Sequence, residues 1–228
     1  MISAKKAVVF GIDGVLFDAA LQTSNARLRA VKAMIEAGLP VDVESCYRTL
    51  EDVVTELGPD STRHFDKLLE RLGLPWSPNI IAAGVVAYRE ASPVYLKPYP
   101  DTIPTILKLR DEGVRLGCCS AGKSVKQWQK LISLDLQHLF HSVVISQDVG
   151  TGQLGSQVIK RVLESLPAAP QETLFVGANR QTEIQVANDS GLVSVLLASR
   201  DSRSNKASGL PDPKYEINKL SEILSLVL

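Results

Sequence analysis

The stretch AVVFGIDGVLFD, residues 7–18, decides the architecture expected for this chain of 228 residues. Its first part, Ala7 to Phe10, is a short apolar run that ends at Gly11. Such a run is typical of a buried strand that enters a loop. Asp13 is the first ionisable residue after the run. We therefore expect a core strand with a carboxylate in the loop at its end.

Strands and helices alternate in the second half of the chain. Short apolar segments are expected to be strands at Val114–Cys119, Val143–Ser146, Leu174–Gly177 and Leu192–Leu197. Helices are expected at Ile103–Glu112, Val125–Leu134, Ser156–Leu166, Gln181–Ser190 and Ile217–Leu226. Apolar strands that alternate with helices imply βαβ units, and hence an α/β fold with a parallel sheet covered on both faces.

Residues 19–95 carry the apolar spacing of helices instead. Helices are expected at Leu21–Ala37, from Asp42 or Glu44 to Leu57, at Ser61–Leu72 and within Trp76–Glu90. Because this block follows the first strand and precedes the second, it is an insertion into the α/β part. We therefore expect a three-layer, Rossmann-like core of residues 1–18 and 96–228, with an all-helical cap domain of residues 19–95.

Ligands of parallel sheets bind outside the carboxyl ends of the strands. One such place is SAGKS, residues 120–124, where small residues precede a predicted helix. Backbone amides at a helix N-terminus attract anions, so Ser120, Ala121 and Lys123 form a candidate anion-binding site. The alternatives are that Ser120 caps the turn after its strand and that Lys123 is a solvated surface lysine.

Composition excludes several classes of function. Lysine plus arginine and aspartate plus glutamate each number 25, so nothing in the net charge calls for nucleic acid or an anionic membrane. No stretch reaches the roughly 18 apolar residues of a membrane span. Cys46, Cys118 and Cys119 lack metal-ligand spacing, and an odd count argues against a disulfide framework. Cys118 and Cys119 lie in an apolar run and are expected to be buried, which fits a reduced, cytoplasmic setting.

Several segments together resemble the haloacid dehalogenase superfamily. Residues 7–18 resemble its first motif, CCSAG (118–122) its second, and TLFVGANRQTEIQVANDSGL (173–192) its fourth. KPYPDTIPTILKLRDEGVRLG (97–117) looks like the linker that returns from the cap. A large insert between the first two motifs is the arrangement of subfamily I. The phrases GLPVD, HFDKLLERLGLP and VKQW are similar to archaeal-type phosphatases of that subfamily.

The resemblance implies a phosphatase mechanism with identifiable positions. A nucleophilic aspartate ends the first strand, and a second aspartate two residues later acts as acid and base. Motif two supplies a hydroxyl and motif three a lysine, both of which hold the phosphoryl oxygens, and magnesium is held partly by a carboxylate of motif four.

This sequence departs from the pattern at most of these positions. The nucleophile position is Gly11, the lysine position is Gln153, and the first motif-four carboxylate is Ala178. Asp13 retains the acid/base position and Ser120 the hydroxyl. A later acidic position survives as Glu183, or is replaced by Thr182. A metal site at Gly11, Asp13, Ala178 and Glu183 is therefore vestigial, and we expect magnesium to bind weakly or not at all.

Three hypotheses about function follow. The main one is a pseudoenzyme, a catalytically degenerate family member that binds a small phosphorylated molecule, another anion or a partner; Asp13 would then be a structural carboxylate bonded to amides of its own loop. The second is an active hydrolase with rearranged residues, either a magnesium-dependent phosphatase of a small phosphomonoester or a dehalogenase-like enzyme. The third is an interaction protein that forms a homo-oligomer or binds a protein partner.

Overall fold

The structure is a computed structural model that describes residues 6–198 and 209–228. Its contacts divide the chain into two compact units. One consists of residues 1–18 and 97–228, and the other of residues 19–96. Each unit is described by itself below.

The first unit contains a six-stranded sheet in the order β3-β2-β1-β4-β5-β6, in which every pairing is parallel. The strands are β1 (Ala7–Phe10), β2 (Arg115–Ser120), β3 (Ser142–Ile145), β4 (Thr173–Gly177), β5 (Val193–Leu197) and β6 (Tyr215–Ile217). The predicted α/β, Rossmann-like fold is confirmed. Every residue of β1 is buried, which explains why that strand is continuously apolar instead of alternating.

The register of the central strands decides where polar groups meet. Phe10 at the end of β1 pairs with Cys118 of β2 and with Val176 of β4. The loops that follow β1, β2 and β4 therefore leave the sheet at the same edge. Because β1 lies between strands that come later in the chain on either side, this edge is the topological switch point at which such sheets bind ligands.

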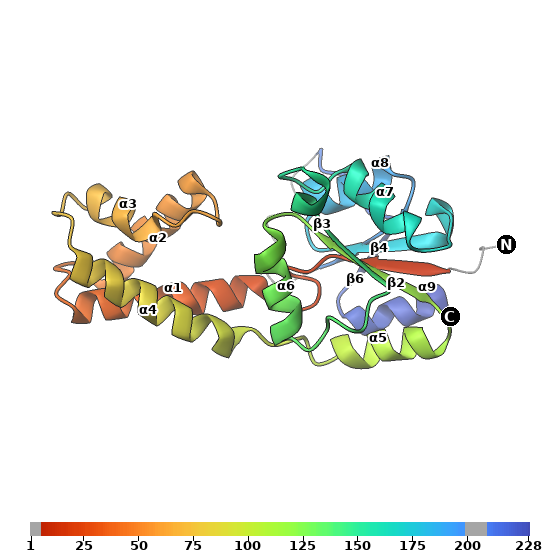
Figure 1. Cartoon of the computed structure of the whole chain (residues 1–228), viewed down its shortest axis with the longest axis horizontal. Helices are drawn as coiled ribbons and strands as arrows, with labels where there is room; N and C mark the ends of the chain where they lie inside the picture. The colour runs from red at the N-terminus through yellow and green to blue at the C-terminus, as the bar shows by residue number, and fades with distance from the viewer. Residues whose placement is uncertain (1–5, 199–208) are drawn as a thin grey trace. The chain divides into compact units, whose positions relative to one another are not determined.

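Helices cover the sheet on both faces (Figure 1), with α5 and α9 on one side and α7 and α8 on the other. The bounds are α5 (Thr102–Asp111), α6 (Ser124–Ser133), α7 (Ser156–Glu164), α8 (Gln185–Asp189) and α9 (Leu224–Val227). Short 3₁₀ turns lie at η1 (Ser146–Val149), η2 (Pro170–Glu172) and η5 (Leu220–Ile223), and a π-helical turn at η3 (Arg180–Ile184). Cys118 and Cys119 are buried, as expected, and Cys118, Cys119 and Cys46 are all free thiols.

The C-terminal segment differs from its prediction. The expected helix over residues 217–226 is wrong in its first part, because Tyr215–Ile217 forms strand β6 beside β5. Tyr215 and Ile217 are residues that fit a pleated strand, and pairing with an exposed sheet edge outweighs the helical spacing of the residues that follow. Helical structure begins only at Leu220.

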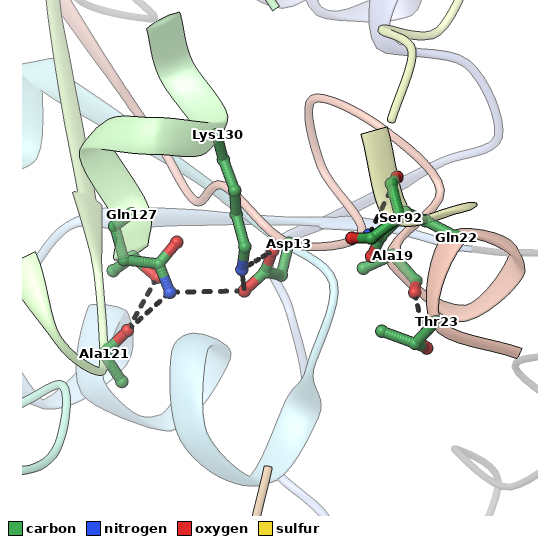
Figure 2. A network of polar contacts seen from close by, with 9 residues as sticks. Asp13, Ala19, Gln22, Thr23, Ser92, Ala121, Gln127 and Lys130 are labelled. Atoms are coloured by element: carbon green, nitrogen blue, oxygen red, sulfur yellow. Dashed lines mark hydrogen bonds and ion pairs between the residues drawn. The ribbon is translucent and has the colours of Figure 1, made fainter. Parts of the chain in front are cut away.

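The second unit consists of four helices, α1 (Ala19–Glu36), α2 (Val43–Leu57), α3 (His64–Arg71) and α4 (Pro78–Tyr95). Helix α1 packs along α4, and the two come closest at Gly84, where a Cβ would lie 2.8 Å from Met34 Cγ. The buried Gln22 side chain on α1 donates to the carbonyl oxygen of Ser92 on α4 at 3.2 Å (Figure 2). Within the described ranges, no helix has the length and apolar character needed to cross a membrane.

Candidate functional site

The loop after β1 begins with a residue that has no side chain. The Gly11 amide donates to the Val176 carbonyl oxygen at 2.8 Å, which holds this loop against β4. A Cβ atom on Gly11 would lie 2.6 Å from Oε1 of Glu183. That separation is close to the distance between Cβ and Oδ within an aspartate. The Glu183 carboxylate therefore occupies the space that an aspartate side chain at residue 11 would need.

Glu183 reaches this space because the chain after β4 starts its helix with the π-helical turn Arg180–Ile184. The Glu183 amide donates to the Asn179 carbonyl oxygen at 3.0 Å, and the Asn179 side chain accepts from the Thr182 amide at 3.1 Å. The Glu183 carboxylate folds back, and its Oε2 accepts from the amides of Ala178 at 2.7 Å and Asn179 at 3.0 Å. Thr182, the alternative acidic position left open by spacing, is exposed. Single π-helical turns are frequent at functional sites.

The protonation of this carboxyl is set by its surroundings. Burial raises the pKa of Glu183 from an ordinary 4.5 to about 7, against the lowering effect of its two backbone hydrogen bonds, and the Asp13 charge raises it further. A carboxyl with a pKa near neutrality can gain and lose a proton at physiological pH. Burial also raises the pKa of the Cys118 thiol well above its ordinary value. A buried thiol with a raised pKa is a poor nucleophile, so nothing favours Cys118 as a replacement for the nucleophilic carboxylate.

Asp13 is held by side chains of α6 (Figure 2). The Lys130 ammonium lies 2.7 Å from Oδ1 and 2.8 Å from Oδ2, and the Gln127 amide nitrogen lies 3.4 Å from Oδ2. Gln127 also donates to the Ala121 carbonyl oxygen at 3.0 Å, which ties α6 to the loop before it. The Lys130 nitrogen lies 5.9 Å from the centroid of the Phe17 ring. The expected bonding of Asp13 to amides of its own loop is thus replaced by an ion pair with a helix.

The candidate anion-binding loop uses its polar groups internally. The Ser120 hydroxyl donates to the Ala121 carbonyl oxygen at 3.1 Å. The amides of Gly122 and Ser124 donate to side-chain oxygens from η1, at 3.0 Å and 2.8 Å. Lys123 is exposed at the start of α6. Two amides that an anion would need are therefore already engaged, and this favours a turn-capping role for Ser120.

The two remaining positions lie in different surroundings. A Cβ on Gly14, which has a φ of +77°, would lie 2.9 Å from the Ala178 Cβ, so the loops after β1 and β4 touch at this point. Ala178 thus lies beside the site and offers a methyl group instead of a carboxylate. Gln153 is exposed in the loop before α7, and with its neighbours it lines a shallow hollow made by residues 151–157.

Comparison with known proteins identifies the family to which this arrangement belongs. The sequence model of the haloacid dehalogenase-like hydrolases matches residues 5–191. The chain belongs to the haloacid dehalogenase-like hydrolase family. A protein named glyceraldehyde 3-phosphate phosphatase from Methanopyrus kandleri is 40% identical, and the alignment covers 97% of both chains. A protein of the same name from Pyrococcus abyssi is 33% identical, over 97% of this chain and 93% of its own.

Solved structures of haloacid dehalogenase-like hydrolases share the fold. An HAD phosphatase from Thermococcus onnurineus has a TM-score of 0.67 and 23% identity, with 97% of both chains covered. The HAD-hydrolase YfnB from Bacillus subtilis, whose structure is bound to magnesium, has a TM-score of 0.72 and 18% identity, with 99% of both chains covered. At these identities the likeness shows the architecture of the family and no more.

Magnesium, which this family generally uses, does not fit the residues present at the site. Magnesium prefers oxygen ligands in octahedral geometry, usually with carboxylates among them. Gly11 and Ala178 supply no side-chain oxygen, both oxygens of Asp13 face the Lys130 ammonium, and Oε2 of Glu183 accepts two amide protons. Over the described ranges, no three acidic, histidine or cysteine side chains cluster as a metal ion would require.

Reasoning from the sequence missed the two α6 residues that contact Asp13. Gln127 and Lys130 are separated by three positions, so they lie on one face of the helix that follows the second motif. That spacing was a usable signal. The sequence alone does not show, however, that this face points at a loop more than a hundred positions earlier in the chain.

Proposed function

We propose that this protein is a phosphatase of small phosphomonoesters, and that three-carbon sugar phosphates are the first substrates to test. One observation supports the proposal: the Glu183 carboxylate lies 2.6 Å from where a Cβ of residue 11 would be, and the resemblance assigns Gly11 to the family's nucleophile position. The names of the relatives from Methanopyrus kandleri and Pyrococcus abyssi support the choice of substrate class.

The retained groups suffice for a two-step hydrolysis. In the first step, Oε1 of ionised Glu183 forms a bond to phosphorus, the ester P–O bond breaks, and the leaving oxygen takes a proton from the Asp13–Lys130 pair. In the second step, the pair takes a proton from a water molecule as the water oxygen attacks phosphorus. Inorganic phosphate leaves and the Glu183 carboxylate is restored. Division into two displacements is the usual advantage of a covalent intermediate.

Several features support Glu183 in this role. Its Oε2 is fixed by two backbone amides, so Oε1 is the oxygen directed at Gly11. Its pKa of about 7 leaves a substantial ionised fraction at neutral pH and makes the carboxylate more basic than an ordinary one. Asp13 and Lys130 form an ion pair at 2.7 Å, and their side chains are 39% and 27% exposed, so a water molecule can reach the pair.

The test is phosphate release from glyceraldehyde 3-phosphate and other small phosphomonoesters. The variants are Glu183→Gln and Asp13→Asn, with Glu164→Gln as the control, an exposed glutamate on α7. Removal of a nucleophile cost on the order of 10⁶ in rate in a serine protease. We expect Glu183→Gln to lose turnover by several orders of magnitude and the control to retain it. Acid quenching during turnover should trap phosphate on Glu183.

A second candidate is a catalytically degenerate protein that binds a phosphorylated ligand. It is favoured by the absence of side-chain oxygens at Gly11 and Ala178, together with the ion pair that engages Asp13. The same assay separates the two candidates. The second candidate is established if the wild-type protein binds these phosphomonoesters without hydrolysing any of them. The mechanism proposed for the first candidate is refuted if turnover survives in Glu183→Gln after contaminating phosphatases have been removed.

A further inference from the structure

A lysine contacts the carboxylate that the resemblance assigns to the family's acid/base position. Lys130 contacts both oxygens of Asp13, the one family carboxylate that this chain retains without change. Lys130 comes from α6, whereas the resemblance places the family's lysine position at Gln153, in the loop before α7. It is therefore an addition to the site and not the family lysine in its usual segment.

The position of Lys130 is fixed by several contacts. Besides the ion pair with Asp13, its nitrogen lies 5.9 Å from the Phe17 ring centroid, and Gln127 one helical turn earlier contacts the same carboxylate. Gln127 is buried and is anchored to the Ala121 carbonyl oxygen. An ammonium group has three N–H donors, and the Asp13 oxygens account for two. A fixed ammonium with donor capacity remaining can bind a phosphoryl oxygen.

The site has fewer carboxylates than the family pattern, and the smaller negative charge suits a single positive charge better than the two charges of magnesium. Magnesium brings two positive charges and is balanced in the family by several carboxylates. Gly11 and Ala178 are uncharged, so Asp13 and Glu183 are the acidic residues among the family positions named above. Asp148 in η1 follows β3 at the same edge of the sheet, where its carboxylate accepts from the Ile145 amide and the Ser124 hydroxyl. Lys130 is paired with Asp13, whereas Oε2 of Glu183 accepts from the amides of Ala178 and Asn179.

We propose that Lys130 supplies the positive charge that magnesium supplies in other hydrolases of this family, so that the protein binds a phosphoryl group without a divalent cation. The inference rests on the phosphorylated ligand class proposed above, but not on turnover. Lys130 would act as a binding residue that touches the phosphoryl oxygens, with Gln127 and Phe17 as positioning residues.

The experiment is calorimetric titration of the full chain with inorganic phosphate and with glyceraldehyde 3-phosphate, after dialysis against EDTA and again with magnesium added. The variants are Lys130→Met, which keeps the length of the side chain without the charge, and Lys130→Arg, which keeps the charge. Lys126→Met on the same helix is the matched control. Circular dichroism and thermal unfolding identify any variant that fails to fold. If Lys130→Met fails to fold, Lys130→Gln replaces it, and the comparison of wild-type binding in EDTA and in magnesium still tests the inference.

We expect binding to persist in EDTA and to be little changed by magnesium. Lys130→Met should weaken it roughly tenfold or more, because hydrogen bonds to charged groups are among the stronger ones, whereas Lys130→Arg and Lys126→Met should stay close to wild type. The inference is overturned if binding requires magnesium, if Lys130→Met and Lys126→Met bind alike, or if neither ligand binds. Phosphate release measured on the same samples tests the proposed function separately, since metal-free binding without turnover upholds this inference and refutes the phosphatase.

Discussion

Replacing Glu183 with glutamine should change how the stability of the protein depends on pH. In the folded chain the Glu183 pKa is about 7, and its ordinary value, which applies to the unfolded chain, is 4.5. The raised pKa means that the folded state prefers the protonated carboxyl. Below pH 4.5 the Glu183 carboxyl is protonated in both the folded and the unfolded chain, so its titration does not change the stability there. As pH rises toward 7 the unfolded state loses its proton first, so stability falls, and the loss is complete above about pH 7.

The magnitude follows from the size of the pKa shift. A pKa shift of one unit corresponds to about 1.4 kcal/mol, so the shift from 4.5 to about 7 amounts to about 3 kcal/mol. Glutamine does not titrate and keeps an oxygen that can accept from the Ala178 and Asn179 amides. The substitution of glutamate by glutamine also changes the unfolding free energy by an amount that does not depend on pH. The difference in unfolding free energy between Glu183→Gln and wild type should nevertheless move by about 3 kcal/mol toward the variant across this pH range.

Urea unfolding followed by circular dichroism at several pH values measures this difference directly. The control is Glu164→Gln, which removes an exposed glutamate paired with Arg161 at the surface of α7. Its difference from wild type should change little, because exposed ion pairs contribute little. A difference between Glu183→Gln and wild type that stays flat from pH 4.5 to above 7, or that moves toward the wild type, would refute the raised pKa of the half-buried Glu183 carboxyl.

Three further predictions concern stability. Gly11→Asp should be destabilising, because its Cβ would lie 2.6 Å from Glu183 Oε1, and combining it with Glu183→Ala, which empties that space, should recover part of the lost stability. A double-mutant cycle should give a coupling of about 1–3 kcal/mol, and additivity within error would contradict the shared space. Lys130→Met should lower the unfolding free energy by about 1 kcal/mol at neutral pH, a modest loss because the ion pair with Asp13 is partly open to solvent. A variant as stable as wild type would mean that the ion pair does not contribute to stability. The buried Ser194 hydroxyl donates to Asn188 Oδ1 and accepts from the Lys214 amide, so Ser194→Ala should lower the free energy of unfolding in urea by about 1–3 kcal/mol. An unchanged free energy of unfolding would mean that these hydrogen bonds are not formed.

Local pattern explains why much of the fold could be predicted. The apolar runs that became β1, β2 and β4 are buried on both faces, so their composition alone identifies them. Helix ends were accurate where a residue with a defined backbone preference stands at the boundary. Helix α2 begins after Asp42, whose side chain accepts from the Ser45 amide at 2.9 Å, and ends at Gly58, which has a positive φ.

The residue types at the site were also readable in advance, since each departure from the family is a property of a single position. Gly11 and Ala178 lack side-chain oxygens in any conformation, and the expectation of weak magnesium binding followed from these residue types alone. The prediction of strand β6 failed because a short edge strand is decided by the neighbour with which it pairs.

By itself, then, the sequence determined most of the order of strands and helices, the inserted helical block and the residue types at the positions assigned by the resemblance, because these depend on local periodicity and on residue type. Only the tertiary structure decided which groups fill the space that was lost. It brings Lys130 onto Asp13 across 117 positions and turns Glu183 back toward Gly11. Contacts between residues so far apart depend on the packing of whole elements, which no local pattern records.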